Sequence, residues 1–240
     1  MSFHLPLMLA ACLLGSEERG KEAGSYLRTV FKAADGTLSE VVEVYIPHPG
    51  DLVMYDDHSK IWDRLYRMVG TEPPDHSGIV IDRLDGTPAV LESGPDNGIR
   101  VRILDLYPRF QNYPGTIYIR RVRAPLTPEK TAELTQFALA QEGKRYAWGR
   151  LLLQGTPCKC REGWRADYFA KTYLDRSSWL CSELVVAAGT VAGLFDPNIH
   201  KANRIYPRDI IDDNTYDLIP IWHLAGMWSR TPERWHANGQ

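Results

Sequence analysis

The sequence predicts an α+β fold in which an antiparallel sheet packs against helices. Segments with the composition of strands fill the first half of the chain, and short turns join them. Segments in which apolar residues recur at helical spacing follow in the second half. Strands first and helices afterwards favour an antiparallel sheet over alternating βαβ units.

Composition limits the class of protein. The 240 residues are enough for one substantial core, and 44% hydrophobic with 24% charged residues is ordinary for a globular chain. The formal net charge of −2 argues against a nucleic-acid partner, which needs a basic face. No run of about 18 apolar residues occurs, so we expect no membrane-spanning helix.

The strands are predicted from β-branched content and from alternation of apolar and polar residues. Asp85-Gly86 is a turn signal between two of them, which predicts a hairpin. The predicted strands are 39–46, 52–55, 76–81, 88–92, 98–104 and 116–122, with 217–222 as a final strand.

Three helices are predicted from spacing and end signals. Residues 58–70 have the pattern of an amphipathic helix. A second begins at Thr127, which is a capping residue followed by proline, and ends at Gly143. The third spans 180–195. Residues 155–178 have no clear period and are interpreted as an insertion in a single domain of residues 26–240.

The first 25 residues allow two interpretations. Leu9-Ala-Ala-Cys12 reads like a lipoprotein signal box, which predicts export to the cell envelope and membrane association through a lipidated N-terminus. The apolar stretch before it is short and lacks a basic start, so an ordinary N-terminal helix in a cytoplasmic protein is the alternative.

The four cysteines match neither a disulfide scaffold nor a zinc pattern. Cys158 and Cys160 are interpreted as two loop thiols, with a disulfide or a metal site as alternatives. We expect neither a metal nor another cofactor.

Cys181 is the candidate nucleophile. It stands where polar residues give way to a helical apolar pattern, in the first turn of the predicted helix. Unpaired backbone N–H groups and the positive end of the helix dipole favour the reactive thiolate there. The alternative is a small core residue.

His76 is the candidate base, and Glu92 is its candidate partner. His76 begins one strand of the predicted hairpin and Glu92 ends the other. Paired residues of adjacent strands lie only about 5 Å apart, so the carboxylate can reach the imidazole and orient it. The alternatives are a structural strand-edge histidine and a solvated glutamate before a turn.

Several motifs together resemble a known family. Gly143-Lys-Arg-Tyr-Ala-Trp-Gly149 followed by Cys181-Ser182 is similar to the signature of NlpC-type cell-wall peptidases. The order Gly50-Asp-Leu-Val-Met54, Asp75-His-Ser-Gly-Ile-Val80 and then Cys181 looks like the circularly permuted branch, the YiiX/YaeF group of papain-like amidases. Ile205-Tyr-Pro-Arg-Asp-Ile210 resembles a segment after the nucleophile helix in that group.

This resemblance implies a permuted papain-like fold and a cysteine-dependent amidase or peptidase. Cys181 is then the nucleophile, His76 the base and Glu92 the orienting residue. Tyr146 matches the family's tyrosine before the nucleophile and is expected to line the cleft, and Tyr55 is expected to reach the site from the first strand. The substrate is expected to be a cell-wall peptide, an isopeptide or an N-acyl compound.

Two other functions stay open. The same permuted superfamily contains lecithin retinol acyltransferases, so a lipid acyltransferase or thioesterase using the same Cys-His site is one alternative. A non-catalytic ligand-binding module is the other, although such a module has no need of Cys181, His76 and Glu92 together.

Overall fold

The computed structural model describes residues 18–33, 35–60, 64, 67, 71–94, 98–154, 156 and 163–232. Within them the protein is a mixed α+β structure with a large sheet and several helices, as predicted. The described chain divides into two compact units, residues 18–46 with 226–232 and residues 47–225. The single domain expected over 26–240 stays a prediction, because this division does not measure independent folding.

The smaller unit contains three antiparallel strands. They are β1 (Tyr26–Lys32), β2 (Leu38–Val44) and β10 (Gly226–Ser229). The strand β1 lies in the middle, with Tyr26 opposite Val44 on one side and Ser229 on the other. Of these strands, only β2 was expected from the sequence.

The larger unit carries a sheet in the order β7-β3-β4-β5-β6-β8-β9. Neighbouring strands are antiparallel except β8 and β9, which are parallel. The strands are β3 (Leu52–Asp56), β4 (His76–Asp82), β5 (Pro88–Gly94), β6 (Arg100–Asp105), β7 (Thr116–Arg120), β8 (Arg145–Tyr146) and β9 (Ser178–Trp179).

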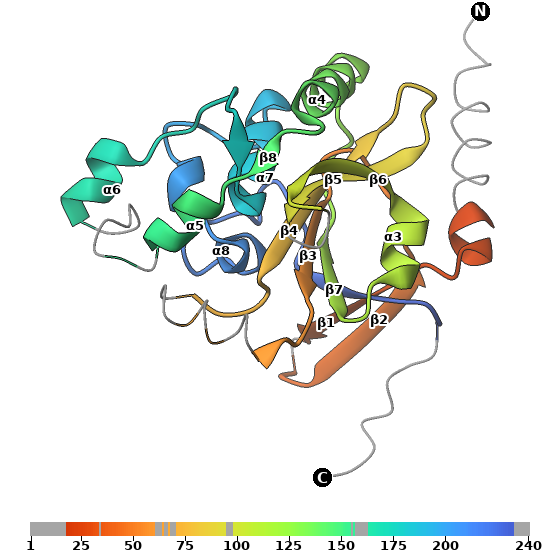
Figure 1. Ribbon diagram of the computed structural model, residues 1–240. Helices are drawn as coiled ribbons and strands as arrows, with labels where there is room; N and C mark the ends of the chain where they lie inside the picture. Colours follow the sequence, from red (N-terminus) through yellow and green to blue (C-terminus); the bar gives the residue numbers. More distant parts are fainter. Residues whose placement is uncertain are drawn as a thin grey trace, which may run out of the picture. The chain divides into compact units, whose positions relative to one another are not determined.

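Helices lie on both sides of this sheet (Figure 1). On one side, α4 and α7 bury their apolar residues against alternate residues of the central strands, such as Ile79 and Leu91. On the other side, α3 packs its Phe110 near Tyr55 of β3. The helices are α3 (Leu106–Asn112), α4 (Pro128–Gln141), α5 (Trp148–Gln154), α6 (Gly163–Phe169), α7 (Cys181–Val191) and α8 (Pro207–Ile211), with a short 3₁₀ turn, η2 (Ala202–Arg204).

The residues at the two ends of α4 explain where the helix begins and ends. The Thr127 side chain accepts a hydrogen bond from the Lys130 N–H at 3.3 Å, so it caps one of the N–H groups that lack a helical partner. Gly143, just past the helix, has a φ of +80°, a conformation that glycine adopts without strain. The predicted helix limits are confirmed.

Other expectations are corrected. Residues 217–222 do not form a strand: Trp222 makes an isolated bridge to Val122, but the backbone N–H groups of Ile221 and Trp222 both donate to the Leu218 carbonyl, at 3.1 and 2.9 Å, in a turn. The segment 155–178 contains α6 and the start of β9, and its interpretation as an insertion stays a prediction. The helix α3 was not expected. Cys12, Cys158, Cys160 and most of the helix predicted at 58–70 lie outside the described residues.

Within the described part of the chain, no helix combines the length and the apolar character needed to cross a membrane.

Candidate active site

His76 is the first residue of β4, and its side chain is 12% exposed. It pairs with Tyr55 of β3, and the two rings stack with their centroids 5.3 Å apart. Because His76 stands at the end of β4, its ring can contact both Glu92, on its own face of the sheet, and the start of α7.

Glu92 of β5 lies on the same face as His76. Its direct partner across the strands is Gly78, so His76 is its diagonal neighbour. The His76 Nε2 and Glu92 Oε2 atoms are 3.2 Å apart, and the Glu92 side chain is fully buried. A side chain at Gly78 would press on Val90, since an added Cβ would lie 2.8 Å from Val90 Cγ2. Glycine therefore lets the two strands pack closely beside this contact.

The other oxygen of Glu92 is held by Arg109 of α3. Arg109 Nε lies 2.8 Å from Glu92 Oε1, and its side chain is 15% exposed. The guanidinium carbon also stands 4.9 Å from the centroid of the Tyr55 ring and 5.2 Å from that of Tyr113. Sequence reasoning missed Arg109, because no local pattern indicates that 105–112 folds back over β5.

Tyr55, which was expected to reach the site from the first strand, contacts the His76 ring, and its role toward a substrate stays a prediction. It is fully buried between the rings of His76 and Tyr113. Burial, together with the charge of Glu92, raises its pKa well above the ordinary value of 10.0, so the hydroxyl stays protonated. Tyr55 therefore packs against one face of the His76 ring.

Cys181 is the first residue of α7 and is 5% exposed. Its side chain interacts with His76 and is one of the groups that raise the pKa of the His76 ring. Ser182 anchors the same turn, because its hydroxyl donates to the Ile205 carbonyl at 2.6 Å. The structure thus brings Cys181, His76 and Glu92 together, although they lie on α7, β4 and β5.

The pKa of His76 reflects opposing effects. Burial is the largest single effect and lowers the pKa, but the hydrogen bonds and electrostatic interactions with Cys181 and Glu92 together outweigh it. The resulting pKa stands well above the ordinary value of 6.5. The charged imidazolium is therefore favoured at neutral pH.

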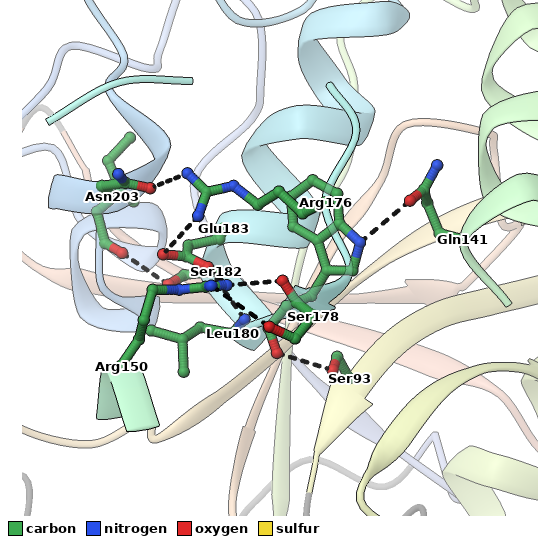
Figure 2. Close-up of polar contacts among 11 residues, drawn as sticks. Ser93, Gln141, Arg150, Arg176, Ser178, Leu180, Ser182, Glu183 and Asn203 are labelled. Carbon is green, nitrogen blue, oxygen red and sulfur yellow. Dashed lines mark hydrogen bonds and ion pairs between the residues drawn. The ribbon is translucent and has the colours of Figure 1, made fainter. Parts of the chain in front are cut away.

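A buried ion-pair network holds the start of α7 (Figure 2). Glu183 is 2% exposed, and its Oε2 accepts from Arg150 Nη2 at 2.7 Å and from the Leu180 N–H at 3.2 Å. Arg176 approaches the other carboxylate oxygen, with its Nη1 3.8 Å away. A glutamate three residues after a helix cap is a recognisable signal, but the two arginines are visible only in the fold.

The segment before Cys181 is also tied to β5. The hydroxyl of Ser93, the residue after Glu92, donates to the Trp179 carbonyl at 3.2 Å (Figure 2). The Ala147 N–H donates to the same carbonyl at 3.0 Å. A hydrogen bond therefore joins β5, which carries Glu92, to the segment that leads to Cys181.

Tyr146 belongs to β8, is 6% exposed and lines a pocket of about 730 Å³. It packs with Ala147 and Leu180, the residue before Cys181. Both its expected position lining the cleft and its role with a substrate stay predictions. Cys181 itself is not among the residues that line this pocket.

The described residues include no group of three or more His, Cys, Asp or Glu side chains arranged to hold a metal ion. Asp56 and His58 form a local turn in which Asp56 Oδ1 accepts from the His58 N–H at 2.9 Å.

Comparisons with known proteins add little to this geometry. No protein-family model matches the chain. No curated protein matches it either. Among solved structures, the chain is similar to the crystal structure of the metalloprotein yiiX from Escherichia coli O157:H7, described as DUF1105. The identity is 19%, the TM-score is 0.44, and the match covers 62% of this chain and 67% of that one. This level of similarity is too low to indicate a shared activity.

Proposed function

We propose that the protein is a cysteine-dependent amidase or peptidase that hydrolyses an amide through a thioester acyl-enzyme. The observation that carries the proposal is the 3.2 Å between His76 Nε2 and the buried Glu92 Oε2, together with the interaction by which the Cys181 side chain raises the pKa of His76. A thiol beside an imidazole that a buried carboxylate orients is the arrangement needed for nucleophilic acyl transfer.

The reaction follows from these contacts. His76 holds the proton of the Cys181 thiol as an imidazolium, and the thiolate attacks the amide carbonyl carbon to form a carbon–sulfur bond. The carbon–nitrogen bond then breaks, and the imidazolium gives its proton to the leaving amine. Water, deprotonated by the same imidazole, attacks the thioester and releases the acid and the free thiol.

Two groups of the chain assist these steps. The Cys181 backbone N–H is at the first position of α7, where no helical acceptor is available, so it can donate to the developing oxyanion. Glu92, held by Arg109, stabilises the imidazolium that forms when the thiol loses its proton.

We further propose that the larger unit is a permuted papain-like domain. In support, His76 precedes Cys181 in the chain, the nucleophile begins a helix packed on an antiparallel sheet, and the base begins a strand of that sheet.

The test is direct capture of the acyl-enzyme. We expect the purified full chain, incubated with a panel of amide and ester acyl donors, to gain the mass of an acyl group in intact-protein mass spectrometry. Cys181→Ala should gain none, and Cys158→Ser should gain as much as the unmodified protein. An adduct that persists in Cys181→Ala would exclude Cys181 as the nucleophile.

A lipid acyltransferase or thioesterase is the second candidate function, and an exposed apolar surface favours it. Trp164 and Tyr168 of α6 are 67% and 70% exposed, and each ring contacts that of Phe169, at centroid distances of 6.0 and 5.0 Å. Exposed aromatic clusters of this kind often mark lipid or protein contacts.

Sedimentation with phosphatidylcholine vesicles tests this second function. Trp164→Ser with Tyr168→Ser should reduce the bound fraction. Leu84→Ser, which removes a 76% exposed apolar side chain elsewhere, should leave it unchanged. Equal binding of all three proteins would remove the support for a lipid substrate.

A further inference from the structure

The pocket beside Tyr146 is lined by basic residues and by no acidic one. Its volume of about 730 Å³ is in the range of sites that hold small molecules. Arg100 comes from β6, Lys144 and Arg145 from β8 and the turn before it, and Arg150 from α5. The remaining lining is largely backbone, aromatic and hydroxyl groups, including Trp148 and Ser178.

Two of these cations face each other directly. Arg100 and Arg145 are paired across the antiparallel β6–β8 bridge, so their side chains leave the sheet on the same face. Like charges in this position repel and reduce stability. Within the described residues, neither arginine has a carboxylate partner; Arg100 donates only to the Gly143 carbonyl, at 2.9 Å.

The other two cations, Arg150 and Lys144, each have a carboxylate partner. Arg150 is paired with the buried Glu183, and Lys144 is paired with Asp175, which is 84% exposed. An exposed pair of this kind is weak and screened by salt. The net result is an excess of positive charge on one wall of the pocket, located at Arg100 and Arg145.

The pocket is close to the candidate nucleophile along the chain. Ser178 lines it and lies three residues before Cys181, so the two Cα atoms are at most about 10 Å apart. Arg150 lines it too and binds Glu183, two residues after Cys181. The pocket therefore adjoins chain segments on both sides of Cys181, within the length of a small substrate molecule.

We propose that this pocket binds an anionic group of the acyl substrate, a carboxylate or a phosphate, through Arg100 and Arg145. The proposal rests on the proposed function, since it assigns the pocket to the substrate of Cys181. An anion between the two guanidinium groups removes their repulsion and accepts charge-assisted hydrogen bonds from both.

Binding of simple anions tests the pocket without any catalysis. Inorganic phosphate and glutarate are titrated separately into the full chain carrying Cys181→Ala, and heat is measured by calorimetry. We expect millimolar or tighter binding of at least one anion, weaker at higher ionic strength. Arg145→Gln should weaken it about tenfold or more, and Arg145→Lys less, because lysine keeps the charge without the planar fork.

The control is Lys32→Gln, which removes one positive charge from the exposed end of β1 and should leave binding unchanged. Preference for phosphate would indicate a phosphorylated substrate, and preference for glutarate a substrate with a free carboxylate. Absence of binding by both anions, or equal binding by the protein with both Arg100→Gln and Arg145→Gln, overturns the proposal.

The two proposals fail separately. Anion binding that depends on Arg145, in a protein that never forms an acyl-enzyme, would refute the amidase and keep the pocket as an anion site. Acyl-enzyme formation without anion binding would keep the amidase and refute the pocket.

Discussion

Arg109 Nε lies 2.8 Å from Glu92 Oε1, so the carboxylate that contacts His76 is itself held from the opposite side by a helix. The Glu92 side chain is fully buried, and each carboxylate oxygen has a partner, His76 at Oε2 and Arg109 at Oε1. A buried carboxylate with partners on both oxygens is held in one orientation. Its contact with His76 then fixes the orientation of the imidazole ring as well.

Replacing Glu92 should reduce turnover without preventing folding. Glu92→Gln keeps the shape of the side chain but loses the charge that stabilises the imidazolium. Loss of the carboxylate in a related triad costs up to about 10⁴-fold in turnover, and we expect a smaller loss here because a thiol depends less on its third residue. Steady-state kinetics across a range of pH values provide the measurement. Unchanged turnover at every pH would reduce the site to a Cys181–His76 dyad.

Cys181 should react with alkylating reagents faster than the other thiols at neutral pH. It combines a helix start with a neighbouring imidazole. Peptide mapping after brief iodoacetamide treatment gives the rate at each cysteine. We expect His76→Ala to slow labelling of Cys181, while His58→Ala, which removes an exposed histidine, should have no effect. Equal rates at Cys158, Cys160 and Cys181 would count against an activated nucleophile.

Glu183 should contribute far more to stability than an exposed glutamate in a comparable ion pair. Glu183→Ala leaves Arg150 and Arg176 without their buried partner, and loss of one member of a buried pair costs about 3–5 kcal/mol of unfolding free energy. Glu133→Ala breaks the exposed pair with Lys130 and should cost less than about 1 kcal/mol. Urea unfolding measures both, and similar losses would mean that the network does not hold α7.

Asp75, the residue before His76, should make stability depend on pH. Burial, with a smaller contribution from the charge of Asp57, raises its pKa from 3.8 to about 7. A carboxyl whose pKa is higher in the folded state contributes stability that is complete below the unfolded pKa and is lost as the pH rises from about 4 to about 7. Relative to Asp75→Asn, the unmodified protein should lose up to roughly 4 kcal/mol of unfolding free energy across this window.

The matched control for this prediction is Asp85→Asn. Asp85 is exposed, and hydrogen bonds from Thr87 lower its pKa below 3.8, so its contribution is lost only as the pH falls. The difference in unfolding free energy between the unmodified protein and Asp85→Asn should therefore stay constant from about pH 5 upward. A constant difference for Asp75→Asn as well would show that the Asp75 carboxyl is solvated.

Local features of the chain are sufficient for much of the secondary structure. Thr127 and Pro128 determine where α4 begins, because capping and a preset φ act within one turn of helix. The hairpin of β4 and β5 follows from alternation and from Asp85-Gly86. The same hairpin, read from the sequence, indicates that His76 and Glu92 can meet, and the diagonal register brings them to 3.2 Å.

The sequence by itself therefore determined the α+β class, most central strands, the helix start at Cys181 and the candidate pair of His76 and Glu92. Only the tertiary structure decided that Arg109 holds Glu92, that Arg150 and Arg176 meet at Glu183, and that Arg100 faces Arg145. These partners lie from 7 to 45 residues apart in the chain. No short-range pattern marks such pairs, because long side chains find their partners only after packing has placed their elements side by side.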